Sequence, residues 1–343
     1  MELTPRKQAV LKAIVKAYIE TGEPIGSKNL MLLLNQPPSS ATIRHEMSEL
    51  CELGLLKQPH TSAGRIPTSK GYKLYVDSLM SAKEANRTLT NTIENTLLSS
   101  HAEPEAIPET AARVLSELTG LPAFACLITE KMPRIKRIEL LTIGRFSKML
   151  LVITDDGRTR NRIFRFGKDF TSSLEDTFNQ LVEKRIKGKT ADTLTKAYIQ
   201  TVVTEAGIYA LDLMPLFSAV CETAAEIEKD KVTFVGEERL YNICVEDTAG
   251  KISALISRKE PILSLLSSIK DETKVIFGSD TKYAELSGSS IIAADFNGSE
   301  KYKGYIGIIG SSRISYEQII PCIEYTAQKL TKIMNEAQKD MEE

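Results

Sequence analysis

The stretch that decides the fold lies at residues 39–53 and reads SSATIRHEMSELCEL. At 100° per residue, Ile43, Met47 and Leu50 fall on one side of a helix, as expected of a stripe that packs on a core. The opposite side carries short or hydrogen-bonding side chains near the N-terminal end, namely Ala41, Thr42, His45 and Ser48, with Arg44 beside them. Short side chains permit close approach to a DNA duplex, and longer polar ones reach base edges. The stretch therefore predicts a recognition helix, with an ordinary amphipathic helix as the alternative because three glutamates follow.

The sequence before this stretch predicts two further helices. Thr4 and Pro5 suit the start of a first helix, and Gly22 suits its end. A short second helix follows over residues 28–34, and Pro37-Pro38 prevents its continuation. The connection GEPIGSK at 22–28 is one residue short of a phosphate-binding loop and follows a helix where such a loop needs a strand, so we reject nucleotide binding there.

The sequence after the stretch predicts a wing. Residues 55–58 suit a short strand, residues 59–68 form a turn-rich loop, and helical spacing resumes at Tyr72. The loop offers hydroxyls, glycine and Arg65 to phosphates or the minor groove, whereas a plain surface turn is the alternative. Helix, short helix, helix, strand and loop is the order of a winged helix-turn-helix. We expect Thr42, Arg44, His45 and Ser48 to approach bases or flanking phosphates. The residues expected to contact the DNA backbone are Ser39, Ser40, Lys57, His60, Thr61, Ser62 and Arg65.

The rest of the chain predicts an α+β body interrupted by helices. A helix near residues 114–118 precedes strand-like runs up to residue 166, and residues 171–230 read as almost continuous helix with breaks near Gly188, Gly207 and Pro215. Further strands and a long final helix follow. We expect a winged helix at 1–80, a connector at 81–108, an α+β domain at 109–170 and 246–343, and an inserted helical domain at 171–245.

Composition limits the function. The 343 residues are 42% hydrophobic and 26% charged, and no apolar run predicts a membrane span or a signal peptide, so we expect a cytoplasmic protein without a membrane. The five cysteines and three histidines are scattered, which gives no metal-site spacing. No catalytic motif is present, and we expect neither a cofactor nor an enzyme. The net charge is −1, but residues 1–80 carry +3 and the remainder −4, a modest asymmetry that permits a DNA-binding front.

Three blocks of sequence carry a resemblance to a known family. They are GEPIGSK at 22–28, SSATIRHEM at 39–47 and QPHTSAGRIPT at 58–68, and KGY at 70–72 and YVD at 75–77 continue the match. These blocks closely resemble the bacterial heat-inducible transcription repressor family HrcA. The stretch 304–315 resembles a C-terminal block of the family. The sequence departs from the family pattern at His45, where Asn is usual, and at Phe277-Gly278-Ser279-Asp280.

The resemblance implies more than the residues do by themselves. It implies a winged-helix domain, a GAF-like α+β domain and an inserted helical domain that forms a homodimer. It implies repression of chaperone operons at an inverted-repeat DNA operator, the CIRCE element, with release on heat stress and modulation by the chaperonin.

Two other functions stay open at this point. GAF-like domains often hold ligands, so the C-terminal module could be a small-molecule sensor, and a metabolic enzyme with an accessory DNA-binding domain is a weaker alternative. For the dimer, we expect the interface on apolar stripes of the helical block: Leu194, Tyr198 and Val202, and Leu211, Met214 and Phe217.

Overall fold

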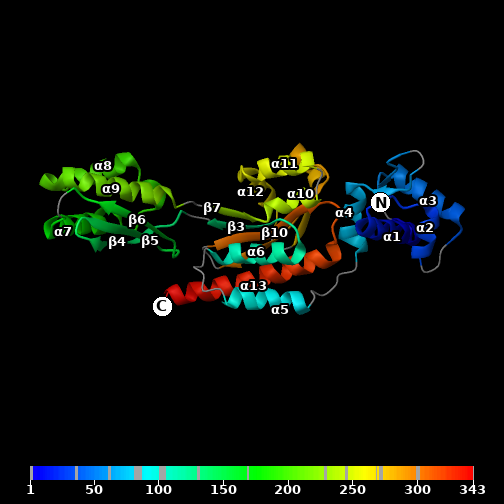
Figure 1. The fold of residues 1–343 in the computed structure, drawn as a ribbon, viewed down its shortest axis with the longest axis horizontal. Helices are drawn as coiled ribbons and strands as arrows, with labels where there is room; N and C mark the ends of the chain where they lie inside the picture. Colours follow the sequence, from blue (N-terminus) through cyan, green and yellow to red (C-terminus); the bar gives the residue numbers. More distant parts are fainter. Residues whose placement is uncertain are drawn as a thin grey trace.

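The computed structural model of the chain consists of three units in a row (Figure 1). An N-terminal helical unit lies at one end, a unit built on a five-stranded sheet lies in the middle, and a unit built on a three-stranded sheet lies at the far end. The structure describes residues 3–34, 38–60, 63–80, 87–99, 106–129, 132–167, 170–227, 230–243, 246–267, 269, 273–298 and 302–342.

The N-terminal unit is a winged helix, as predicted. Its elements are α1 (Pro5–Thr21), α2 (Ser27–Leu33), α3 (Ser40–Glu52), β1 (Leu56–Lys57), β2 (Ile66–Pro67), α4 (Ser69–Leu74) and the π-helical turn η1 (Tyr75–Leu79). The side chain of Thr4 accepts the backbone N–H of Lys7, and Gly22 ends α1 with a φ of 72°. Both predicted ends of the first helix are therefore confirmed.

The middle unit has one antiparallel sheet between two layers of helices. The strand order is β7-β3-β10-β9-β8, with β3 (Ala123–Thr129), β7 (Asp230–Val235), β8 (Lys274–Phe277), β9 (Ser289–Gly298) and β10 (Tyr302–Ser311). One face packs on α6 (Ile107–Thr119) and the long α13 (Tyr316–Glu342), and α5 (Arg87–Ser99) lies against both helices. The other face packs on α10 (Leu240–Ile243), α11 (Glu246–Ile256) and α12 (Glu260–Leu266). Short turns η6 (Glu237–Arg239), η7 (Gly278–Asp280) and η8 (Ala284–Leu286) join these elements.

The far unit has its own sheet and its own core. The strands β4 (Ile135–Gly144), β5 (Ser147–Thr154) and β6 (Thr159–Arg165) form a three-stranded antiparallel sheet. The chain then forms α7 (Ser172–Leu181), η3 (Val182–Ile186), η4 (Ala191–Thr193), α8 (Lys196–Thr204), η5 (Gly207–Tyr209) and α9 (Ala210–Ala225). Leu150 and Val152 of β5 pack under these helices, which cover one face of the sheet.

The predicted boundaries of the insertion are wrong. Residues 109–170 do not form one domain, because β3 belongs to the five-stranded sheet whereas β4, β5 and β6 pack with α7, α8 and α9. Likewise, β7 and α10 lie within the predicted insertion 171–245 but belong to the middle unit. The insertion therefore spans about residues 132–227 and is α+β rather than helical. Apolar patterning identifies strands, but it does not say with which sheet each strand pairs.

One further prediction for the helical block is wrong, and a second is narrowed. Pro215 does not break a helix, because it lies inside α9. Half of the apolar stripe residues are unavailable as an interface, since Leu194, Val202 and Phe217 are at most 2% exposed in the core of the far unit. The other three are accessible: Leu211 is 89% exposed, and Tyr198 and Met214 are half-buried. Burial of one helical face against the unit's own sheet satisfies the same periodicity that an interface would.

One segment has the length and composition of a membrane span. Among the described residues, Gly207–Ala225 is apolar enough to cross a bilayer. Its residues Leu213, Leu216, Phe217 and Val220 are fully buried against the rest of the far unit. The segment is thus the core helix of a folded unit.

Candidate nucleic-acid interface

The start of α3 is held by hydroxyl groups. The Ser39 hydroxyl accepts the backbone N–H of Thr42 at 3.1 Å, and the hydroxyls of Ser39 and Thr42 lie 2.9 Å apart. This N-cap satisfies one of the free amides in the first turn, where the helix dipole favours a phosphate. Thr42 is half-buried and already bonded, so it contributes to the cap as well as to the surface.

The core side of α3 determines which residues face outward. Ile43, Met47 and Leu50 are buried in the winged-helix core, as predicted from the periodicity. Their burial leaves Arg44, His45 and Ser48 exposed on the other side, together with Ala41. The predicted face of α3 is therefore confirmed as a solvent-facing surface. Contact of this face with DNA stays a prediction.

Arg44 has an anchor that the sequence did not reveal. The Ser27 hydroxyl accepts the Arg44 Nε–H at 3.3 Å and lies 3.1 Å from the Ser40 hydroxyl. Ser27 is only 8% exposed, at the start of α2. The Ser27 hydroxyl thus holds the guanidinium stem between the two helices. Ser27 belongs to a family-like block, but nothing in the sequence pairs it with a residue 17 positions later.

Two of the glutamates that argued against DNA binding face α1 instead. Glu46 is 8% exposed and pairs with Arg6 at 3.9 Å, and Glu49 pairs with Lys7 at 3.3 Å. The Glu49 carboxylate also lies 3.8 Å from the His45 imidazole. The negative charge of these two residues is therefore offset inside the unit, which weakens the objection raised by the sequence.

The wing is short and is fixed at its base. Arg65 forms two backbone hydrogen bonds with Ile25, of 3.0 and 2.9 Å, so the β-ribbon continues onto the connection between α1 and α2. A Cβ atom at Gly64 would lie 2.4 Å from the backbone of Ile25, so only glycine permits this approach. Arg65 is half-buried at the base of the wing, with its Nε buried.

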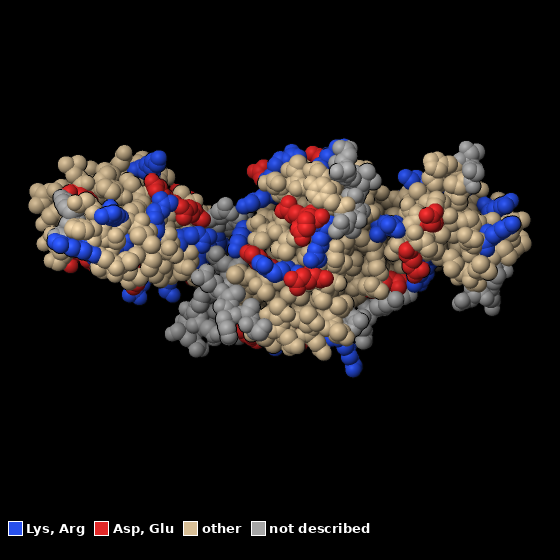
Figure 2. Space-filling model, viewed as in Figure 1, with Lys and Arg blue, Asp and Glu red and all other residues tan. Residues whose placement is uncertain are grey.

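The structure describes two of the four remaining predicted wing residues. Lys57 and His60 are exposed. Thr61 and Ser62 lie outside the described residues. Figure 2 shows Lys and Arg side chains at the outer end of the winged-helix unit. The described part of the wing therefore offers one cation at its base and one on β1.

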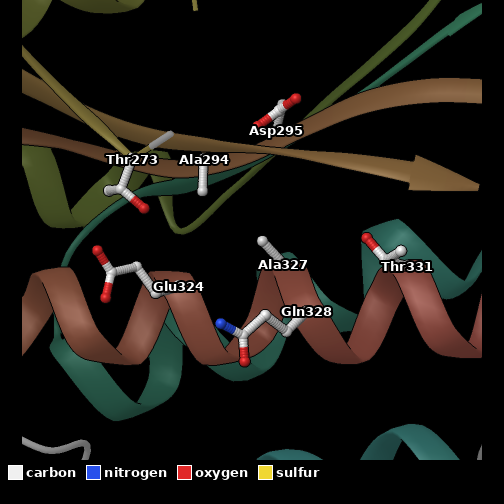
Figure 3. A pocket seen from close by; sticks show the side chains of 7 residues that line it. All are labelled: Thr273, Ala294, Asp295, Glu324, Ala327, Gln328 and Thr331. Atoms are coloured by element: carbon white, nitrogen blue, oxygen red, sulfur yellow. The ribbon is translucent and has the colours of Figure 1, made fainter. Parts of the chain in front are cut away.

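A groove of about 450 Å³ between β9 and α13 is a candidate small-molecule site. Ala294 and Ala327 face each other across it, and Thr273, Glu324, Gln328 and Thr331 surround it, whereas Asp295 points away from it on the other side of the strand (Figure 3). Glu324 and Gln328 are exposed. Among the described residues that line the groove, no convergent set of charged groups would select a ligand. Among the described residues, no three His, Cys, Asp or Glu side chains gather as a metal site would require.

Comparison with known proteins gives matches over nearly the whole chain. A model described as "Winged helix-turn-helix transcription repressor, HrcA DNA-binding" matches residues 2–79, and one described as "HrcA protein C terminal domain" matches residues 105–320. The "Heat-inducible transcription repressor HrcA" of Erythrobacter litoralis is 31% identical over 97% of this chain and 98% of its own length. The protein of the same name from Thermoanaerobacter pseudethanolicus is 30% identical over 99% of both chains. A solved structure of a hypothetical protein, 22% identical, has a TM-score of 0.72 and covers 98% of this chain and 100% of that one, which supports the fold.

Proposed function

Because the chain belongs to the HrcA family of heat-inducible transcription repressors, we propose that it represses chaperone operons as a homodimer on an inverted-repeat operator of the CIRCE type. The family is one of DNA-binding repressors and not of enzymes. The observation that carries the proposal is the exposed row of Arg44, His45 and Ser48 behind the Ser39 cap of α3. A cytoplasmic location follows from this role.

The proposed contacts divide into two groups. Thr42, Arg44, His45 and Ser48 approach base edges or flanking phosphates in the major groove, because Thr42, Arg44 and His45 occupy the N-terminal half of α3 and Ser48 lies one turn further along the same side. Phosphate contacts position the protein and come from Ser39, Ser40, Lys57, His60, Thr61, Ser62 and Arg65. Ser27 adds to this scheme by holding the stem of Arg44.

The proposed dimer interface is the outer face of the three-stranded sheet, which we define by Leu141, Met149, Leu151, Ile153 and Ile163. The strand register places Leu141, Met149 and Ile163 side by side across the three strands. Leu141 is 40% exposed and Ile163 is 65% exposed, and none of the five belongs to a buried cluster. A two-fold axis through this face would bury it and would give the protein two recognition helices.

Release from DNA on heat stress requires a fall in the fraction of protein that is competent to bind. A tenfold fall in the fraction of competent protein needs only about 1.4 kcal/mol. The chaperonin, by binding and refolding the repressor, would restore that fraction. Both relatives above are named as heat-inducible repressors, which supports release on heat. In the part of the chain that the structure describes, the alternative of a small-molecule sensor has in its favour the open groove between β9 and α13.

Footprinting of the purified protein on the promoters of chaperone operons tests the proposal. We expect two protected half-sites related by a two-fold axis, with their centres about one or two helical turns apart, or 34–36 Å per turn. Protection at a single half-site, or equal protection of unrelated DNA, would contradict it.

A further inference from the structure

The winged helix packs directly on the middle unit, because the two units share a hydrophobic core. Tyr72 of α4 stacks on Phe277 with ring centroids 6.4 Å apart, and Tyr316 lies 6.1 Å from each of them. The buried side chains of the winged helix and of one face of the five-stranded sheet form a single cluster. Phe277 begins the segment in which this sequence departs from the family pattern.

A buried carboxylate lies beside these rings. Glu317, 8% exposed in the first turn of α13, accepts the Tyr75 hydroxyl hydrogen at 2.9 Å and pairs with the Lys16 ammonium at 2.7 Å. Burial and then the bond to Glu317 raise the pKa of Tyr75, so its hydroxyl stays protonated and remains the donor. Glu317 thus joins the middle unit to two elements of the winged helix, α1 and η1.

Two contacts at the rim of this junction support the same alignment. The Lys73 ammonium lies 3.2 Å from the Asp280 carboxylate. The guanidinium of Arg313 lies against Gly22, where an added Cβ would be 2.4 Å from Arg313 Nη1. Gly22 has a φ of 72°, so a side chain there would be strained as well as crowded. The C-terminal end of α1 is therefore held on the middle unit by packing and by charge.

Helix α1 connects this junction to the recognition helix. Its C-terminal half carries Lys16, bound to Glu317, and its first turn carries Arg6 and Lys7, bound to Glu46 and Glu49 of α3. Lys7 and Lys16 are nine residues apart, about 14 Å along the axis. A tilt of about 15° at the junction would move α3 by roughly 3.5 Å, close to the base-pair step of about 3.4 Å.

We propose that Glu317 is a positioning residue: with Tyr75 and Lys16 it fixes the angle of α3 on the body, and so selects the spacing between operator half-sites. This inference rests on the proposed dimer and inverted repeat. In a dimer the distance between two recognition helices is set by every rigid joint between them, and this junction is one such joint in each protomer. A loosened joint would let each α3 reach half-sites at several spacings.

The test measures the affinity of full-length protein for operators whose central spacer is lengthened or shortened by one base pair. For the wild-type protein we expect a loss of about tenfold or more for each change, as a misplaced contact typically produces. Glu317→Ala should reduce this ratio to less than about threefold while its affinity for an isolated half-site stays within about threefold of wild type. Glu317→Gln, which keeps an acceptor for Tyr75, should fall between the two.

The chain supplies a matched control for these variants. Glu94 of α5 accepts the Tyr325 hydroxyl hydrogen at 2.9 Å and pairs with Lys329 at 2.6 Å, so the same three residue types meet on the same helix α13 away from the winged helix. Glu94→Gln should leave the spacer profile unchanged. Tyr75→Phe, which removes only a hydroxyl, is the second test variant if Glu317→Ala does not fold.

The outcomes separate the possibilities. The inference is supported if the spacer profile is flattened in the Glu317 and Tyr75 variants but not in Glu94→Gln. A profile as steep as wild type, or an equal loss of affinity at every spacer, would mean that the junction only stabilises the fold and would overturn it. A wild-type protein that binds one half-site as tightly as two would instead overturn the proposed dimeric function, and this inference with it.

Discussion

Ile163 offers a direct way to dissociate the proposed dimer. It lies on the outer sheet face, on the edge strand β6, opposite Met149 of the central strand β5. Replacing it with Asp puts a carboxylate into the apolar interface on both protomers at once, because a two-fold interface uses the same patch twice. We expect the variant to be monomeric and to lose tight binding to the inverted repeat.

The size of the effect follows from exposure. Burying a fully exposed Ile contributes about 1.5–3 kcal/mol. Since 65% of Ile163 is exposed, the two copies together contribute roughly 2–4 kcal/mol to the dimer. That corresponds to a 30- to 1,000-fold rise in the dimer dissociation constant, approximately, before the desolvation of the new carboxylate is added.

Light scattering and sedimentation of the purified variants give the assay, with thermal unfolding as a check of the fold. Leu98→Asp on α5 is the matched control, because Leu98 is 63% exposed but lies outside the far unit. Leu211→Asp tests the alternative interface at the start of α9, where Leu211 is 89% exposed. The reasoning fails if Ile163→Asp remains dimeric, and a monomeric Leu211→Asp would then place the interface on α9. Ile163→Thr, which keeps a β-branched side chain, separates loss of the interface from loss of the strand.

Three further predictions concern the wing and the release of DNA on heating. Arg65→Ala should weaken binding to all DNA sequences and reduce the salt slope of log K by about one unit, measured by titration at several salt concentrations; an unchanged slope would exclude a phosphate contact. Gly64→Ala should destabilise the unit by about 1–3 kcal/mol in denaturant unfolding, because its methyl group meets the backbone of Ile25, whereas Gly26→Ala, with open space around it, should have a much smaller effect. Operator binding should fall over a narrow rise in temperature and return when chaperonin is added; binding that persists well above growth temperature would argue against direct thermal loss.

The winged helix could be predicted from sequence because its signals are local. Capping residues, prolines and the apolar helical period indicate where α1, α2 and α3 begin and end. Each of these signals involves residues only a few positions apart in the chain. The exposed face of α3 follows from the same period, since the burial of Ile43, Met47 and Leu50 determines where Arg44 and His45 point.

The division of the body could not be predicted in the same way. The strands β3 and β4 are neighbours in sequence, and both have strand-like runs, yet they pair in different sheets. Strand β7 (Asp230–Val235) is not predicted from the sequence, because it begins where the predicted helical block of residues 171–230 ends. Partners of a strand are a long-range property that alternation of side chains does not encode.

The junction contacts escaped prediction for a related reason. Tyr75 and Glu317 lie 242 positions apart, and neither residue type is unusual in its own segment. The same holds for Ser27 and Arg44, whose hydrogen bond joins two helices. Such contacts depend on the assembled fold and become visible only there.

The central claim is that α3 reads base pairs in each half-site of an inverted repeat, and one measurement tests it most directly. Wild type and His45→Asn are titrated against operators substituted at each position of both half-sites, at several salt concentrations. Imidazole and amide groups present different donors and acceptors, so the variant should change its preference at one base pair per half-site, by about 1–3 kcal/mol, with the salt slope nearly unchanged. A changed salt slope with no change in base preference would contradict the claim, because His45 would then contact the DNA backbone and α3 would present a different face to the bases.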